Sequence, residues 1–326
     1  MTIPATHCSI GGRAALLVLP LATSEVQNGA MIDISRLIVW VMIFAVPAAV
    51  TLAILVMIKL ARDKEARLPF TRQPLRAPGE SVRRKADEIF DSISMHLVLL
   101  CFAWPATGFV LGLVQHGELK LTAAIGLIVS IAGAGIIGTR MALKLRTYAD
   151  YRIGSLGEQV VGRELDQLMA QGYRVFHDVE FEGWNIDHVV VGPRGVFAVE
   201  TKTRRKPSKR SGLEAKVVFD GETLTYPGKS HERDAIEQAS RNAESLAKWI
   251  AESAAENIPV VPVIALPGWA LDIRRYGPVA VYSATDMGEP MLKRGKTQLN
   301  PGQIERITHQ LRRVCEVEST GSPKST

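Results

Sequence analysis

The chain is poor in cysteine, and its three cysteines are far apart. Cys8, Cys101 and Cys315 show none of the short spacings that bind zinc, and they suggest no disulfide framework. The serines and cysteines also form no recognisable nucleophile triad. These absences argue against a disulfide scaffold, a zinc site and a serine or cysteine hydrolase, and they suit a reducing cytoplasm.

An excess of positive charge is missing from the second half of the chain. The net charge is +6, yet the residues from Asp150 onward include 24 Lys and Arg against 24 Asp and Glu. The excess therefore lies in the first half, and the overall charge is no evidence that the second half binds nucleic acid.

Three long runs in the first half contain no Asp, Glu, Lys or Arg: 37–58, 97–114 and 121–139. Each has about the 20 residues needed to cross a bilayer. We therefore expect an all-α membrane domain, residues 36–145, with transmembrane helices at about 37–58, 95–115 and 121–141. Only His96 lies near a span as an ionisable group, which argues against a transporter or channel. Four glycines predict a homo-oligomer through the third transmembrane helix: Gly126, Gly133, Gly135 and Gly138.

Lysine and arginine are unevenly distributed around these runs. The connection 59–91 holds nine of them, whereas residues 1–36 hold two and the 115–120 turn holds one. This bias predicts a multi-pass protein of a bacterial inner membrane, with the N-terminus outside and the C-terminal domain cytoplasmic. Residues 1–35 are an extracytoplasmic segment in this scheme. A weak signal-like core and a true start at Met31 both stay open.

The second half has the pattern of a mixed α/β domain, residues 150–316, followed by a disordered tail, 317–326. Ser155 and Glu158 have capping-box spacing, which predicts that a helix begins there and buries a stripe that includes Met169. The elements expected after it are strands at 173–181, 186–192 and 195–202, a hairpin at 216–226, a helix at 232–256, strands at 258–266 and 277–283, and a helix at 301–317. The resulting order is α-β-β-β-α-β.

One stretch, NIDHVVVGPRGVFAVETK (185–202), combines a buried hairpin pattern with charged residues. If the loop at GPRG has two or four residues, Asp187 lies opposite Glu200 and shares a face with it and with Lys202. A three-residue loop would place the two acids on opposite faces. His188 is expected to face away from Asp187 and is interpreted as structural.

Two carboxylates held face to face repel each other unless a cation lies between them. Mg²⁺ prefers oxygen ligands, keeps several waters and makes a bound water more acidic. Lys202 could orient that water or offset charge on a phosphate. Two acids, a lysine and a divalent cation therefore predict a site that cleaves phosphodiester bonds.

Three stretches resemble the nuclease-related domain called NERD, of the PD-(D/E)xK nuclease superfamily: GSLGEQVVGREL, NIDHVVVGPRGVFAVETK and IEQASRNAESL. The resemblance covers about residues 152–265 and leaves the membrane half outside. It implies a PD-(D/E)xK nuclease-like core, a divalent metal and a nucleic-acid substrate. After ETK the chain continues with TRRKPSKRSG, where the family has an aromatic residue and a glycine.

The resemblance assigns roles residue by residue. It implies that Glu158, Asp187 and Glu200 hold Mg²⁺ or Mn²⁺, and that Lys202 and Gln238 complete the catalytic set. Each has a structural alternative as well. The charged hairpin residues could form a cross-strand salt-bridge set, Glu158 could belong to a capping box, and Gln238 could be a surface residue of its helix.

A basic segment follows the hairpin directly. Five of its residues are predicted to grip the phosphate backbone of nucleic acid: Arg204, Arg205, Lys206, Lys209 and Arg210. A solvated loop and a contact with anionic lipid of the bilayer are the alternatives.

These observations predict a membrane-anchored, divalent-metal-dependent nuclease that cleaves phosphodiester bonds on the cytoplasmic face. DNA is its expected substrate. The alternative is a catalytically silent nuclease-like module that binds nucleic acid or a protein partner at the membrane.

Overall fold

The computed structural model describes residues 75–114, 120–207, 214–228, 231–285 and 287–316, and also Ala49, Leu52, Ala53, Val56 and Met57. The other residues of the first expected span, 37–58, lie outside this description. So do Lys209, Arg210 and the tail 317–326.

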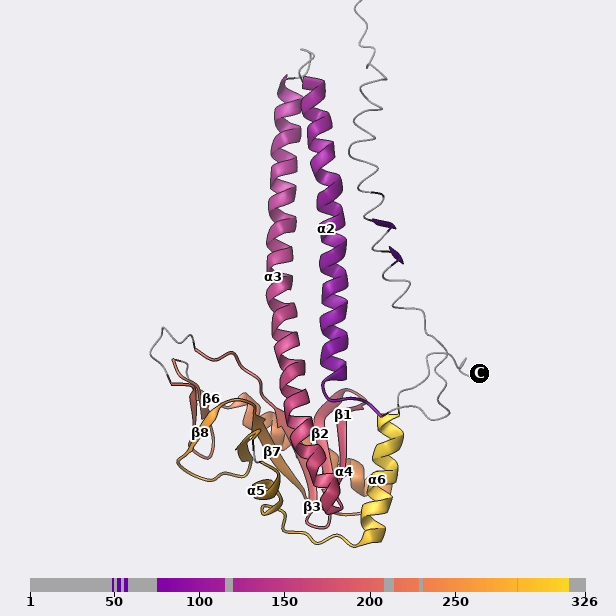
Figure 1. Ribbon diagram of the computed structural model, residues 1–326, viewed down its shortest axis with the longest axis vertical. Helices are drawn as coiled ribbons and strands as arrows, with labels where there is room; N and C mark the ends of the chain where they lie inside the picture. Colours follow the sequence, from indigo (N-terminus) through magenta and orange to yellow (C-terminus); the bar gives the residue numbers. More distant parts are fainter. Residues whose placement is uncertain are drawn as a thin grey trace, which may run out of the picture.

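Two long helices stand side by side on the α/β domain (Figure 1): α2, Glu80–Val114, and α3, Lys120–Asp166. They include nearly all of the second and third expected spans. Within the described residues, one segment is long and apolar enough to cross a membrane, Ile128–Gln171, and none of its apolar window is buried inside the molecule. The described residues thus offer one candidate span where the sequence predicted three, and the first of those three lies almost wholly outside them.

Helix α3 runs without a break through Ser155, so the prediction that a helix begins there is wrong. An N-cap cannot lie inside a helix, because the backbone N–H groups there are already bonded to carbonyls of the preceding turn. The buried hydroxyl of Ser155 instead donates to the carbonyl oxygen of Gly79, 3.1 Å away. Met169 is exposed, against expectation, because the chain has left α3 for the 3₁₀ helix η1, Gln167–Gln171.

The main sheet has five strands in the order β1-β2-β3-β7-β9. Strands β1, β2 and β3 pair antiparallel, whereas β7 and β9 add in parallel. Helix α4, Asp234–Ala254, precedes β7, so the predicted α-β-β-β-α-β order is confirmed. The bounds are Arg174–Phe181 for β1, Trp184–Gly192 for β2, Gly195–Thr201 for β3, Val260–Leu266 for β7 and Ala280–Ser283 for β9.

A second, smaller sheet lies beside the first, with the strand order β6-β5-β4-β8. The predicted hairpin is present as β4, Lys216–Phe219, and β5, Leu224–Thr225. Strands β6, His231–Glu232, and β8, Ala270–Ile273, were not predicted, because such short pieces leave little alternation in the sequence. The short helix α5, Gly288–Leu292, was also not predicted.

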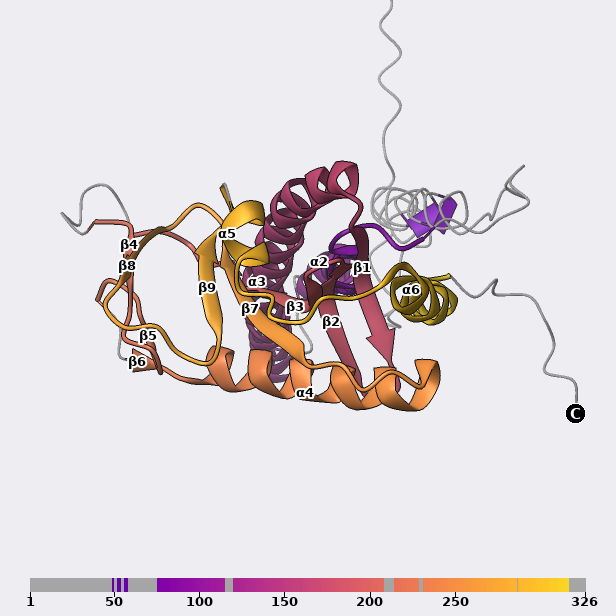
Figure 2. The ribbon, with the colours of Figure 1, turned by 90° about the horizontal axis from the view of Figure 1, so that it is seen from below.

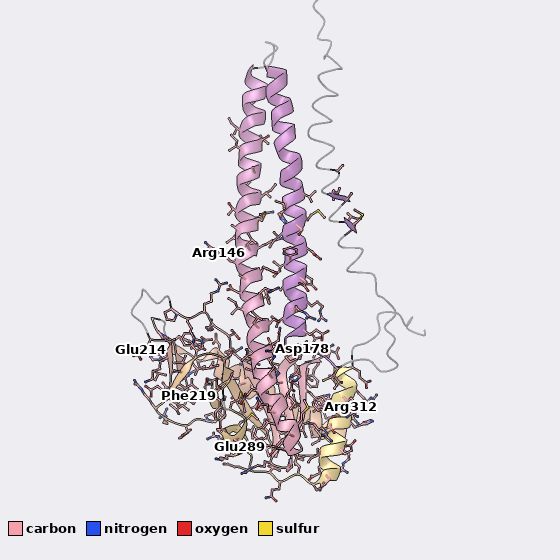
Figure 3. The ribbon with its side chains drawn as sticks, viewed as in Figure 1. Arg146, Asp178, Glu214, Phe219, Glu289 and Arg312 are labelled. Carbon is pink, nitrogen blue, oxygen red and sulfur yellow. The ribbon has the colours of Figure 1, made fainter. Side chains whose placement is uncertain are left out.

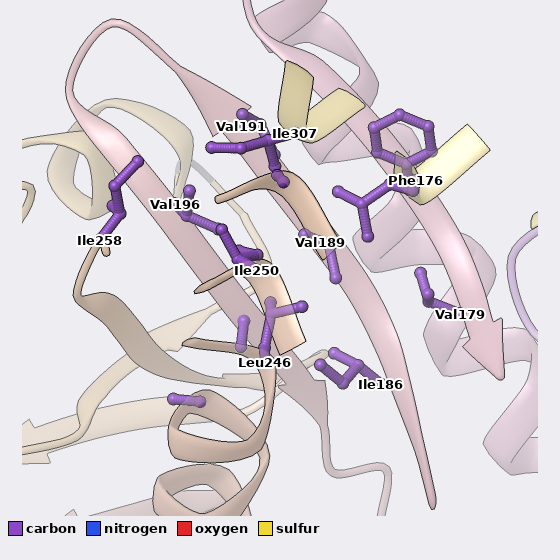
Figure 4. Packing of buried hydrophobic residues seen from close by; sticks show 14 of the residues in the cluster. Phe176, Val179, Ile186, Val189, Val191, Val196, Leu246, Ile250, Ile258 and Ile307 are labelled. Carbon is purple, nitrogen blue, oxygen red and sulfur yellow. The ribbon is translucent and has the colours of Figure 1, made fainter. Parts of the chain in front are cut away.

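Helices cover both faces of the main sheet (Figure 2). On one face, α4 and α6, Pro301–Cys315, pack on β-strand residues such as Val189 and Val196, and Figure 4 shows this cluster around Leu246 and Ile250. On the other face, the end of α3 packs Val161 and Leu165 against the sheet. The domain is therefore a mixed α/β fold with flanking helices, which fits a nuclease-like core.

Candidate functional site

The hairpin β2–β3 has the register that the metal-site prediction requires. Gly192 faces Gly195 across a loop of two residues, and His188 faces Val199. The pairing ends there, one step before Asp187 and Glu200, and the two carboxylates still lie close enough that Glu200 contributes to the raised pKa of Asp187. The predicted loop of even length is confirmed, and it brings the two acids together.

Glu200 is buried and accepts hydrogen bonds at both carboxylate oxygens. Its Oε1 accepts from Lys202 Nζ at 2.8 Å and from Gln238 Nε2 at 2.7 Å. Gln238 Oε1 in turn accepts from Lys202 Nζ at 2.8 Å. Three of the predicted site residues therefore form one closed set of contacts, which joins β3 and the chain just after it to the first turns of α4.

Asn242 belongs to this site, although the sequence prediction missed it. Its side-chain amide donates to Glu200 Oε2 at 3.0 Å and to the carbonyl oxygen of Asn185 at 3.2 Å. It follows Gln238 by four residues, and side chains at this spacing share a helix face. That spacing within IEQASRNAESL is the signal that could have identified it.

Glu158 reaches the same site from α3. Its side chain is buried, and its Oε2 has no hydrogen-bond partner. Burial, together with the nearby carboxylates of Asp178 and Glu200, raises the pKa of Glu158 to about 8, and Lys202 partly opposes this rise. A buried carboxyl that lacks a partner needs either a proton or a cation.

Asp187 lies at the centre of the acidic group. Its Oδ2 accepts from the backbone N–H of Thr201 at 2.7 Å. Burial raises the pKa of Asp187 well above its usual value, and the carboxylates of Glu200 and Glu158 raise it further. Carboxyl groups from α3, β2 and β3 therefore lie close together, and the pKa of two of them, Glu158 and Asp187, is raised.

Asp178, on β1, is a fourth acid near the site that the sequence analysis did not single out. Its Oδ2 accepts from the backbone N–H of Ser81, 2.7 Å away, at the first turn of α2. Figure 3 labels Asp178 near the lower end of α2. Burial raises its pKa, and the hydrogen bonds from Ser81 oppose this rise. Asp178 thus ties the first turn of α2 to the sheet and adds negative charge near Glu158.

The close approach of α3 to the site depends on Gly157. A Cβ at this position would lie 1.8 Å from Thr203 Oγ1 and 2.9 Å from Thr203 Cβ. Gly157 therefore lets α3 pass close to the chain just after β3. Gly162 serves a different contact, because its Cβ would meet Pro78, just ahead of α2.

Replacing Gly157 with alanine is expected to lower the free energy of unfolding by about 2 kcal/mol, because overpacking would force α3 away from Thr203. Urea unfolding of the purified chain measures this effect. Gly154→Ala is the matched control on the same helix, since its Cβ would lie at an ordinary 3.5 Å from Val82 Cγ1. Equal stability of the two variants would contradict the inferred contact.

The basic residues after β3 are partly engaged within the chain. Arg204 pairs with Glu232 and lies over the ring of Tyr226, and Arg205 pairs with Asp150 at 2.9 Å. Lys206 is exposed near Gly268. Lys209 and Arg210 are among the residues that the structure does not describe.

In the described part of the chain, no group of three or more His, Cys, Asp or Glu side chains is placed to hold a metal ion. The carboxylate of Glu200 accepts hydrogen bonds from Lys202, Gln238 and Asn242. The oxygen donors that a Mg²⁺ ion prefers are nevertheless gathered there, and one of them, Glu158 Oε2, has no partner.

Comparison with known families gives a match over the part of the chain that contains this site. The model of the nuclease-related domain, NERD, matches residues 153–267, which is about a third of the chain. All the residues of the site just described, from Glu158 to Asn242, lie within that match. Comparison with curated proteins and with solved structures gives no match. Residues 153–267 are thus similar to a nuclease-related domain, and the matched region begins within helix α3.

Proposed function

We propose that this chain is a membrane-anchored nuclease that cleaves phosphodiester bonds, with DNA as its main substrate, at the cytoplasmic face of a bacterial inner membrane. The observation that carries the proposal is the site where Asp187, Glu200 and Lys202 meet Glu158 and Gln238 within the nuclease-related domain. The anchor is argued from the apolar part of α3 and from the lysine and arginine bias of the sequence.

A divalent cation, Mg²⁺ or Mn²⁺, would be held by Glu158, Asp187 and Glu200. The fit rests on the unpartnered Glu158 Oε2 and on the pKa of Glu158 and of Asp187. Burial raises both pKa values, and repulsion among the carboxylates, which a cation would relieve, raises them further. When bound, such an ion makes a coordinated water more acidic and polarises a phosphoryl oxygen.

The residues of the chain do the rest. Lys202 is about a quarter exposed, so its ammonium can reach a water or a phosphate oxygen while it keeps its bond to Glu200. Gln238 and Asn242 hold the Glu200 carboxylate in one orientation. Lys206, Lys209 and Arg210 would contact the phosphate backbone, joined by Arg204 and Arg205 if substrate displaces their acidic partners.

A second candidate is a catalytically silent module that binds nucleic acid or a protein partner at the membrane. The specific observation in its favour is that both oxygens of Glu200 already have partners among Lys202, Gln238 and Asn242. Such a closed set needs no cation.

The deciding experiment uses the purified full chain in detergent with supercoiled plasmid and single-stranded DNA, in the presence of Mg²⁺, Mn²⁺ or EDTA. Cleavage by the wild type with metal, its loss in Glu200→Ala and its retention in Glu244→Ala, an exposed acid of α4, would support the nuclease. Cleavage by Glu200→Ala as well would point to contamination. DNA binding that weakens with salt, without cleavage, would favour the silent module.

A further inference from the structure

A chain of buried hydrogen bonds lies behind the proposed site. Asp166 Oδ1 lies 3.0 Å from His177 Nε2, and His177 Nδ1 lies 2.9 Å from His188 Nδ1. His188 Nε2 then lies 3.2 Å from Thr201 Oγ1. Both histidines and Thr201 are buried, and Asp166, at the end of α3, is partly exposed. The chain therefore runs from the surface to the strand that carries Glu200.

The direction of every hydrogen bond in this chain follows from chemistry. A carboxylate only accepts, so His177 Nε2 donates to Asp166. Burial lowers the pKa of His177, so its ring is neutral at pH 7 and has a single N–H. His177 Nδ1 must then accept from His188 Nδ1–H. The buried ring of His188 contacts His177 and Thr201 and bonds to no carboxylate, so a second ring proton would leave an unpaired buried charge, and Nε2 accepts from the hydroxyl of Thr201.

Thr201 occupies the position between Glu200 and Lys202. Side chains alternate along a strand, so the Thr201 hydroxyl is directed away from the face that carries these two residues. Its backbone N–H donates to Asp187, and its side chain is held by His188. One residue thus links the acids on the front of β3 to the histidines behind it.

We infer that His177 and His188 fix the Thr201 side chain in one rotamer and thereby set the positions of Asp187, Glu200 and Lys202, so that both histidines and Thr201 are positioning residues for the proposed cleavage. This inference rests on the proposed nuclease function. It assigns a role to two histidines that touch no acid of the site. It also makes Asp166 the outer support of the arrangement, since its carboxylate selects the tautomer of His177.

The first test needs no activity. In the full chain labelled with ¹⁵N-histidine, in detergent at pH 7, NMR is expected to show His188 with its proton on Nδ1 and an accepting Nε2. Thr201→Val removes the donor and should shift the Nε2 resonance, whereas Thr201→Ser keeps it. Asp166→Ala should disturb the His177 ring, and Glu164→Ala, a carboxylate of α3 bonded to Gln167, should not. A proton on Nε2 of His188, or a charged ring, would overturn the inference.

The second test measures plasmid cleavage with Mg²⁺. Thr201→Val is expected to lower kcat about 10- to 100-fold with KM unchanged, because small displacements of reacting groups are costly, and Thr201→Ser should stay within about threefold. Wild-type cleavage by Thr201→Val would overturn the positioning role. A wild type that cleaves nothing with either metal would instead refute the nuclease, and the ring tautomers would still decide whether the histidines hold Thr201.

Discussion

Replacing Glu158 with glutamine is expected to stabilise the metal-free chain by about 4 kcal/mol at pH 8 and to change little at pH 4. The pKa of Glu158 in the folded chain is raised to about 8 from a usual value of 4.5, chiefly by burial. The folded state therefore holds its proton up to a higher pH than the unfolded state does. The stability of the wild type must fall as pH rises from about 4.5 to about 8, and glutamine removes this loss because it stays neutral.

Urea unfolding in EDTA between pH 4 and pH 8.5 measures the effect, with the exposed surface change Glu244→Gln as control. The same loss of stability with pH in Glu158→Gln and wild type would contradict the buried, proton-holding carboxyl. Mg²⁺ or Mn²⁺ should restore stability to the wild type at pH 8 and should do so much less for Glu158→Gln, since a cation can replace the proton only where a carboxylate is present.

Replacing Lys202 with methionine is expected to slow metal-dependent DNA cleavage by about 10²- to 10⁴-fold, the usual range for losing a group that assists proton transfer or charge stabilisation. Methionine keeps the length of the side chain and removes the ammonium that contacts Glu200 and Gln238. Initial rates at saturating DNA measure the change.

Lys206→Met is the matched control, because Lys206 belongs to the same segment and lies near Gly268, away from Glu200. It should weaken DNA binding and reduce its dependence on salt, with kcat nearly unchanged. Equal loss of kcat in both variants would show that the two lysines act together through binding, and it would remove the special role of Lys202.

The hairpin was predictable from the sequence because its register depends on one property, whether the loop has an even or an odd number of residues. Once the loop has two residues, the pairing runs from Gly192 and Gly195 to His188 and Val199, one step short of Asp187 and Glu200, and the apolar residues leave one acceptable face. The buried stripe of α4, from Ala235 to Ile250, was predictable for a similar reason, since its spacing matches the helix period.

The start of α3 was mispredicted because a capping box is a local pattern. Ser155 and Glu158 have the right spacing, yet the residues before them are also helical. The Ser155 hydroxyl bonds to Gly79 instead, and the Glu158 carboxyl is buried near Asp178 and Glu200. Asp178 and the pair His177–His188 were not recognised for the same physical reason. Their partners lie on other elements, and no pattern along the chain brings Ser81 to Asp178 or Asp166 to His177.

The unbroken course of α3 gives Glu158 a fixed angular relation to the apolar part of the same helix. Eighteen residues separate Arg140 from Glu158, about 27 Å of helix, and each residue turns the helix by about 100°. Adding one residue between them would rotate the apolar part of α3 by about 100° relative to Glu158, whereas adding seven would nearly restore the original angle. Any twist applied to the far end of α3 would likewise reach the carboxylate as a rotation, so the helix transmits torque as well as position.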